Sequence, residues 1–219
     1  MHCPIRCLFK PAIFLVLGLG VSCSSFAHPH SWIDIKTIIQ GTSGTVDSMK
    51  MQWTFDRMTT AYLLDGEDLS IQHREQTLNT IAKSIINNMH PSHDFTYLQE
   101  GDRLLHYQDI SDPVLKLEKG KAVLSFTLSL VKPYHFDGKA LSLRVFDPTY
   151  YVDMSWSSEQ DIQFSNSLKS ECTFSLHEPH PSASQVNKAM LIPVDASPDY
   201  QLGKIFTQTV NFSCHYENK

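Results

Sequence analysis

The stretch Met49-Lys50-Met51-Gln52-Trp53-Thr54-Phe55-Asp56 alternates large apolar side chains with polar ones. Side chains of a β-strand point alternately to its two faces, so this pattern predicts a strand with one buried and one solvated face. Residues 32–40, rich in Ile and Thr, precede it across the turn at 41–44. The two stretches together predict an antiparallel hairpin.

Further along the chain the same alternation returns at 122–130 and 141–145, with shorter strand candidates at 150–156 and 172–176. Residues 70–89 change period: apolar side chains recur at three and four, which predicts an amphipathic helix that Ser70 or Asp68 can cap and that ends before Pro91. Two short helices are predicted at 184–191 and 200–208. The chain therefore predicts an α+β fold, mainly antiparallel sheet with one long amphipathic helix packed on it.

The N-terminal segment has the features of an export signal. Arg6 and Lys10 precede an apolar run of about a dozen residues, and small residues lead up to His28. We expect residues 1–27 to be a cleaved signal peptide, residues 28–219 to form a single domain or two intimate lobes, and the protein to be periplasmic. The alternative is a lipoprotein anchored at Cys23, which Gly20 disfavours because a Leu is usual there. The apolar run is short for a membrane span, and no second candidate follows.

Cleavage after Ala27 removes three of the five cysteines and leaves Cys172 and Cys214. Two cysteines in an exported chain are most simply one disulfide. A metal site built on the two thiols is the alternative, but an oxidising compartment disfavours it.

The overall composition narrows the function classes. The 219 residues include 18 basic and 23 acidic side chains, for a net charge of −5, so a general nucleic-acid binder, which needs a basic face, is disfavoured. The sequence has no GxSxG, HExxH, glycine-rich phosphate loop or CxxC. We therefore expect a protein that is not an enzyme.

The predicted mature N-terminus, His28-Pro29-His30-Ser31-Trp32-Ile33-Asp34, is the first candidate site. On an extended chain His28, His30 and Asp34 project to one side, and two imidazoles with a carboxylate are a partial site for zinc or another transition metal. The α-amine and imidazole of His28 together would suit copper. Pro29 has no amide proton, so it excludes the square-planar chelate that uses backbone amides. The alternative is two solvated histidines.

The second candidate site is Phe146-Asp147-Pro148-Thr149-Tyr150-Tyr151-Val152-Asp153, where Asp147 and Asp153 flank a turn set by Pro148. Either carboxylate can ligate a metal or orient an imidazole, and ordinary turn chemistry is the alternative. The histidine pairs 90/93 and 177/180 are weaker candidates.

HPHSWID after a signal peptide, WTFD at 53–56, FDPTYYVD at 146–153 and a late C…LG…C layout resemble one periplasmic family. That family is catalogued as a domain of unknown function and labelled an uncharacterised transport-system periplasmic component. Some members resemble zinc-acquisition proteins that act beside an inner-membrane permease of the nickel/cobalt type. The resemblance implies periplasmic metal handling, and its motif positions here are His28, His30, Asp34, Asp56, Asp147, Tyr150 and Asp153.

From these patterns we expect a zinc-binding transport component that hands its metal to such a permease, with copper, nickel or cobalt as other possible metals. The expected ligands are His28, His30, Asp147 and Asp153, with Asp34, Asp56 and Tyr150 as secondary candidates. A copper protein using the His28 amine, or a structural module that does not bind metal, are the alternative functions.

Overall fold

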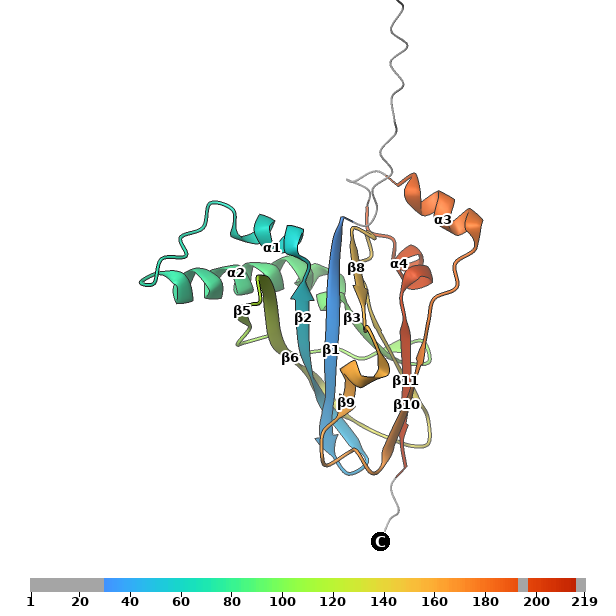
Figure 1. Ribbon diagram of the computed structural model, residues 1–219. Helices are drawn as coiled ribbons and strands as arrows, with labels where there is room; N and C mark the ends of the chain where they lie inside the picture. Colours follow the sequence, from blue (N-terminus) through green and yellow to red (C-terminus); the bar gives the residue numbers. More distant parts are fainter. Residues whose placement is uncertain (1–29, 193–196, 216–219) are drawn as a thin grey trace, which may run out of the picture.

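The protein is described by a computed structural model for residues 30–192 and 197–215 (Figure 1). The predicted signal peptide at 1–27 and His28 lie outside these described residues.

The sequence pattern at 49–56 builds the middle of a six-stranded sheet, which we name sheet A. Its order is β5 (Val114–Glu118), β6 (Lys121–His135), β2 (Thr45–Phe55), β1 (Ser31–Thr42) and β8 (Val152–Ser155), and β9 (Ile162–Phe164) also pairs with β1. β1 and β2 form the predicted antiparallel hairpin, with Ile33 opposite Phe55. β8 and β9 run parallel to β1, so sheet A is mixed along this edge.

A second sheet, sheet B, is antiparallel throughout. Its order is β10 (Cys172–His177), β11 (Thr209–Cys214), β7 (Leu141–Val145), β3 (Thr96–Glu100) and β4 (Arg103–Leu104). The apolar faces of both sheets contribute to one hydrophobic cluster, which includes Trp53 of β2, Leu143 of β7 and Phe212 of β11. The apolar residues of the alternating pattern therefore form a core that the two sheets share, and the polar residues lie on the outer faces.

Four α-helices occur in the described part of the chain: α1 (Arg57–Leu64), α2 (Arg74–Met89), α3 (Ala183–Met190) and α4 (Tyr200–Phe206). The architecture is therefore α+β. Helices α3 and α4 confirm the short helices predicted at 184–191 and 200–208, whereas α1 was not predicted. Short 3₁₀ segments lie at His90–Phe95 and Glu159–Asp161. None of the helices in the described ranges is both long enough and apolar enough to cross a bilayer.

Helix α2 corresponds to the amphipathic stretch at 70–89. Its buried side chains belong to the core cluster: Leu78, Ile81, Ala82, Ile86 and Met89. It begins at Arg74, four residues later than expected, because Asp68 and Ser70 form a turn ahead of it instead of capping it. It ends before Pro91, as predicted.

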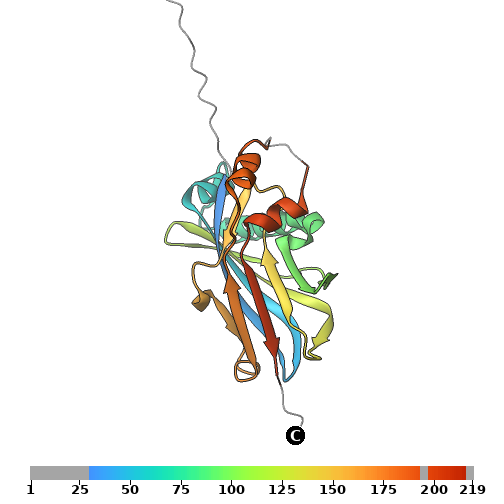
Figure 2. The same cartoon turned by 90° about the vertical axis from the view of Figure 1, so that its right-hand side faces the viewer.

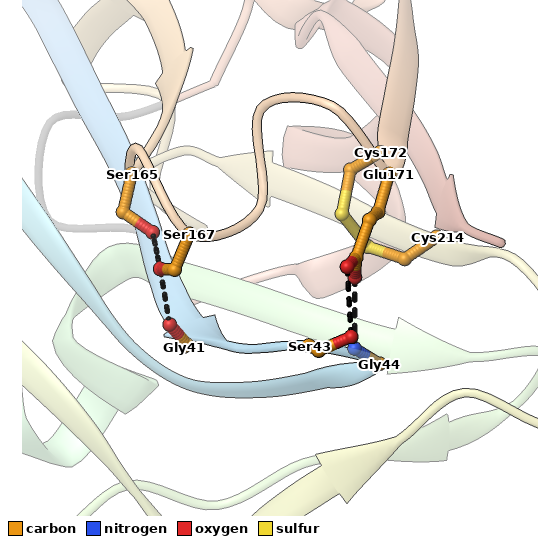
Figure 3. Close-up of a disulfide and its surroundings, with 8 residues drawn as sticks. All are labelled: Gly41, Ser43, Gly44, Ser165, Ser167, Glu171, Cys172 and Cys214. Atoms are coloured by element: carbon orange, nitrogen blue, oxygen red, sulfur yellow. Dashed lines mark hydrogen bonds between the residues drawn. A yellow bond between two sulfur atoms is a disulfide. The ribbon is translucent and has the colours of Figure 1, made fainter. Parts of the chain in front are cut away.

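The predicted disulfide is present between Cys172 and Cys214, which face each other across β10 and β11 (Figure 3). Next to it, the Glu171 carboxylate accepts hydrogen bonds from Ser43 Oγ at 2.7 Å and from the Gly44 amide at 3.2 Å. These contacts tie the β1–β2 turn of sheet A to the start of β10 in sheet B. The tie lies at the end of the molecule opposite to the start of β1, α3 and α4 (Figures 1 and 2).

Candidate functional site

The starts of β1 and β8 lie side by side and form what we name the N-terminal edge. The parallel register pairs Ser31 with Val152 and Trp32 with Asp153. The His30 amide donates to the Tyr151 carbonyl at 2.9 Å, and the two rings stack with centroids 4.7 Å apart. Two predicted sites that are far apart in sequence, the N-terminal motif and the 146–153 motif, are thereby brought together.

The predicted alternation along β1 is present. Ser31 and Ile33 are buried, whereas Trp32 and Asp34 between them are exposed. Neighbouring strands in register present paired side chains on the same face, so Asp153 belongs to the outer face with Trp32. Met154, the next residue, is buried in the core on the opposite face.

Asp147 is buried and holds the turn before β8. Its carboxylate accepts four hydrogen bonds: from the Thr149 amide at 2.9 Å, the Thr149 hydroxyl at 2.7 Å, and the amides of Tyr151 and Val152 at 3.1 Å each. Three of these bonds are made to Oδ2 and one to Oδ1, so the turn uses most of the acceptor capacity of the carboxylate. The same turn holds Tyr150 at φ 58°, a conformation that few side chains adopt. Asp147 therefore positions β8, which favours Asp153 over Asp147 as the acidic ligand.

Asp153 has the opposite environment. Its side chain is half-buried, and none of the described residues donates a hydrogen bond to it or pairs with its charge. Burial raises the pKa of Asp153. It lines a small recess with Tyr150 and Phe206, whose rings are 4.5 Å apart. Burial, and then the charge of Asp153, raise the pKa of Tyr150.

Asp56 is the N-cap of α1. Its carboxylate accepts from the amides of Met58 and Thr59, and also from the Trp32 amide of β1 at 3.0 Å. Burial opposes ionisation, but the hydrogen bonds from Thr59, Trp32 and Met58 together lower the pKa of Asp56. Asp56 therefore fixes the start of α1 to the start of β1. The sequence predicted Asp56 as a secondary candidate ligand, and its role as an N-cap was not predicted.

The remaining candidates are dispersed. Asp34, opposite Ser155 of β8, pairs with Lys121 at 3.6 Å, and His177 of β10 bonds Ser175 at 2.9 Å. Within residues 30–192 and 197–215, no three His, Cys, Asp or Glu side chains are placed to share one metal ion. His28, which the sequence pairs with His30, is outside those ranges.

Two contributors to the N-terminal edge were not selected as site residues from the sequence. Tyr151 supplies the ring against His30. Gly203 of α4 lies so close to the 146–147 segment that a Cβ there would be 2.4 Å from Cδ2 of Phe146. The Leu202-Gly203 pair of the C…LG…C layout was the available signal for this contact. α4 is further fixed by the Asp199 amide, which donates to the Pro148 carbonyl at 2.8 Å.

Comparison with known proteins gives two findings. A family model described as "Protein of unknown function (DUF1007)" matches residues 13–214. An uncharacterized protein of Haemophilus influenzae is 26% identical over 204 residues, which cover 91% of this chain and 97% of that protein.

Proposed function

The chain belongs to the family of proteins of unknown function DUF1007, and on that premise we propose that it is a periplasmic transition-metal carrier. Zinc is the first choice of metal, and the recipient is an inner-membrane permease of the nickel/cobalt type. The proposed ligands are His28, His30 and Asp153.

The observation that carries this proposal is the environment of Asp153. A half-buried carboxylate normally has hydrogen-bond donors or a counter-ion, because burying a charge without a partner is costly. Asp153 has none among the described residues, and it lies on the strand paired with the first residues of β1. A cation held between this carboxylate and the imidazoles would supply the missing partner. Mixed imidazole and carboxylate ligands suit zinc.

The other carboxylates of the N-terminal edge support the site without touching the metal in this proposal. Asp147 fixes the turn that starts β8, and Asp56 fixes the start of β1 to α1. Their hydrogen bonds hold the two strands in position before any ligand arrives. Such outer residues determine how well a metal site is organised.

The surface at this end of the molecule supports a protein partner. Trp32, Met58 and Tyr62 are 47%, 63% and 83% exposed, and the first two donate their amides to the same Asp56 carboxylate. Exposed apolar side chains beside a binding site suit contact with another protein. Release to that partner is favoured by acid, because imidazole and carboxylate ligands bind metal only when deprotonated.

The test is zinc affinity of the processed protein, with its first residue confirmed by intact mass and affinity measured by competition with a chelator. His28→Ala, His30→Ala and Asp153→Asn should each weaken binding at least about tenfold, or 1.4 kcal/mol. Binding should also fall steeply below about pH 6. His177→Ala and His180→Ala are matched controls that should change little.

Equal affinity in the His30 variant and the unmodified protein would refute the site. Tight binding of copper alone, abolished when Ala27 is retained ahead of His28, would replace zinc with the copper alternative. Absence of binding for every metal tested would leave the structural-module alternative.

A further inference from the structure

A cavity of about 850 Å³ lies well away from the N-terminal edge. It opens between the segment at 103–106, which includes β4, and the far end of β6 at 131–135. We name it the β4–β6 cleft. Its volume is within the range of sites that bind small molecules.

An irregularity in β6 shapes one wall of the cleft. Val46 pairs with Tyr134 and Ser48 pairs with Ser129, so one residue of β2 opposes the four residues 130–133 of β6. This bulge is held in place, because the Val131 amide donates to the His106 carbonyl at 2.9 Å. Bulges of this kind redirect side chains and are frequent next to functional sites.

The cleft is lined by three cationic side chains, Arg103, Lys132 and Lys139, and by two carboxylates, Glu100 and Asp137, an excess of one positive charge on a chain whose net charge is −5. Arg103 and Lys139 both pair with Glu100, and Lys139 also pairs with Asp137 at 3.1 Å. Lys132, at the bulge, has no acidic partner among the described residues. His106 and His135 add two imidazoles, and Nδ1 of His135 is bonded to Thr45 Oγ1 at 2.9 Å.

A buried hydroxyl gives a second indication of a ligand. Tyr134 lines the cleft and is only 6% exposed, and its hydroxyl has no hydrogen-bond partner in the described structure. The Arg103 guanidinium lies over its ring, 5.9 Å from the centroid. A buried polar group without a partner is costly, and a ligand group entering the cleft would relieve that cost.

We propose that the β4–β6 cleft binds a small organic anion through its oxyanion group, with Lys132 as the principal charge partner and the Tyr134 hydroxyl as a hydrogen-bond donor. Arg103 and Lys139 line the site, but their charges are already paired with Glu100. Lys132 supplies the charge that has no acidic partner among the described residues. The attraction is electrostatic and partly solvent-exposed, so it should weaken as salt rises.

The test uses the metal-free, full-length processed protein and isothermal titration with citrate, succinate and inorganic phosphate at low ionic strength. Saturable binding of at least one of these anions is expected, and the comparison separates carboxylate from phosphate recognition. Lys132→Ala and Tyr134→Phe should each weaken it by about fivefold or more. Lys169→Ala removes an equal charge from an exposed position outside the cleft and should leave the affinity unchanged.

The proposal is overturned if no anion binds saturably, or if Lys169→Ala weakens binding as much as Lys132→Ala. His30→Ala provides the separation from the metal site: it should leave anion affinity unchanged. A failure of the anion-binding proposal can therefore be distinguished from a failure of the zinc proposal.

Discussion

Two carboxylates of one short motif have opposite environments in the fold. Asp147 accepts four hydrogen bonds within its turn, whereas Asp153, six residues later, has no donor among the described residues. The sequence offered both as ligands, because residue type and motif position do not reveal how many backbone amides converge on a side chain. The hydrogen bonds of the turn separate the two roles.

Asp153→Asn should stabilise the metal-free protein near neutral pH. Burial raises the pKa of Asp153, so the folded state binds its proton more tightly than the unfolded state does. The free energy of unfolding of the wild type therefore has its full value below the unfolded pKa of 3.8. It falls as the pH rises through the raised pKa of Asp153 in the folded state. Chemical denaturation should show a gain on the order of 1 kcal/mol at pH 7 that vanishes near pH 3. A loss of stability at pH 7 would contradict this account of Asp153.

Asp56→Ala should destabilise the protein by about 1–2 kcal/mol, because an N-cap and the bond to the Trp32 amide are lost. The pKa of Asp56 is lowered, so its contribution is present above the unfolded value of 3.8 and is lost as pH falls through the folded pKa. Denaturation curves of the two proteins should therefore converge in acid. Asp34→Ala, which removes an exposed carboxylate of β1 that pairs with Lys121, is the control and should have a smaller effect.

At the scale of elements, the strands and the helix with a repeated apolar pattern could be predicted from the sequence. Alternation located β2, β6 and β7, the Ile- and Thr-rich composition of 32–40 located β1, and the three-and-four spacing located α2. Helix α1 gave no such signal, because it has eight residues and buries only Thr60. The parallel pairing of β1 with β8 was also beyond prediction, since alternation indicates which face of a strand is buried and not which strand lies beside it.

The contact of α4 with the 146–147 segment leads to a prediction for that element. Gly203→Ala should destabilise the protein by about 1–3 kcal/mol, because the new methyl group would lie 2.4 Å from a Phe146 ring carbon and 3.2 Å from the Asp147 carbonyl. If α4 also sets the turn before β8, zinc affinity should fall as well. Lys204→Ala, on the exposed side of the same helix, is the control. An unchanged melting temperature for Gly203→Ala would contradict the close packing.

At the scale of the whole molecule, the two sheets are fastened at the end remote from the N-terminal edge. The Cys172–Cys214 disulfide closes a loop of 42 residues within sheet B, and Glu171 connects that corner to the β1–β2 turn of sheet A. The disulfide was predictable because the predicted signal cleavage leaves two cysteines. The Glu171 contacts were not, because nothing in the local sequence indicates a partner about 130 residues away.

Replacing both cysteines with alanine should lower the free energy of unfolding by about 4 kcal/mol on the loop-entropy model. Glu171→Gln should cost less, about 1 kcal/mol, since the amide oxygen can keep one of its two hydrogen bonds. Urea denaturation of the oxidised, reduced and variant proteins measures each effect. Reduction without any loss of stability would contradict the role of the disulfide.

The parallel pairing of β1 with β8 also constrains the order in which the chain assembles. β1 can pair with β2 at once, but its other neighbours follow about 120 residues later, so one edge of the first hairpin stays open until most of the chain has been made. Contacts of such long sequence separation close slowly, and open strand edges invite pairing with other chains. Pulsed hydrogen exchange during refolding should therefore protect the amides shared by β1 and β2 before those shared by β1 and β8. The two histidines proposed to hold metal are therefore synthesised long before Asp153, the third proposed ligand, which arrives with β8.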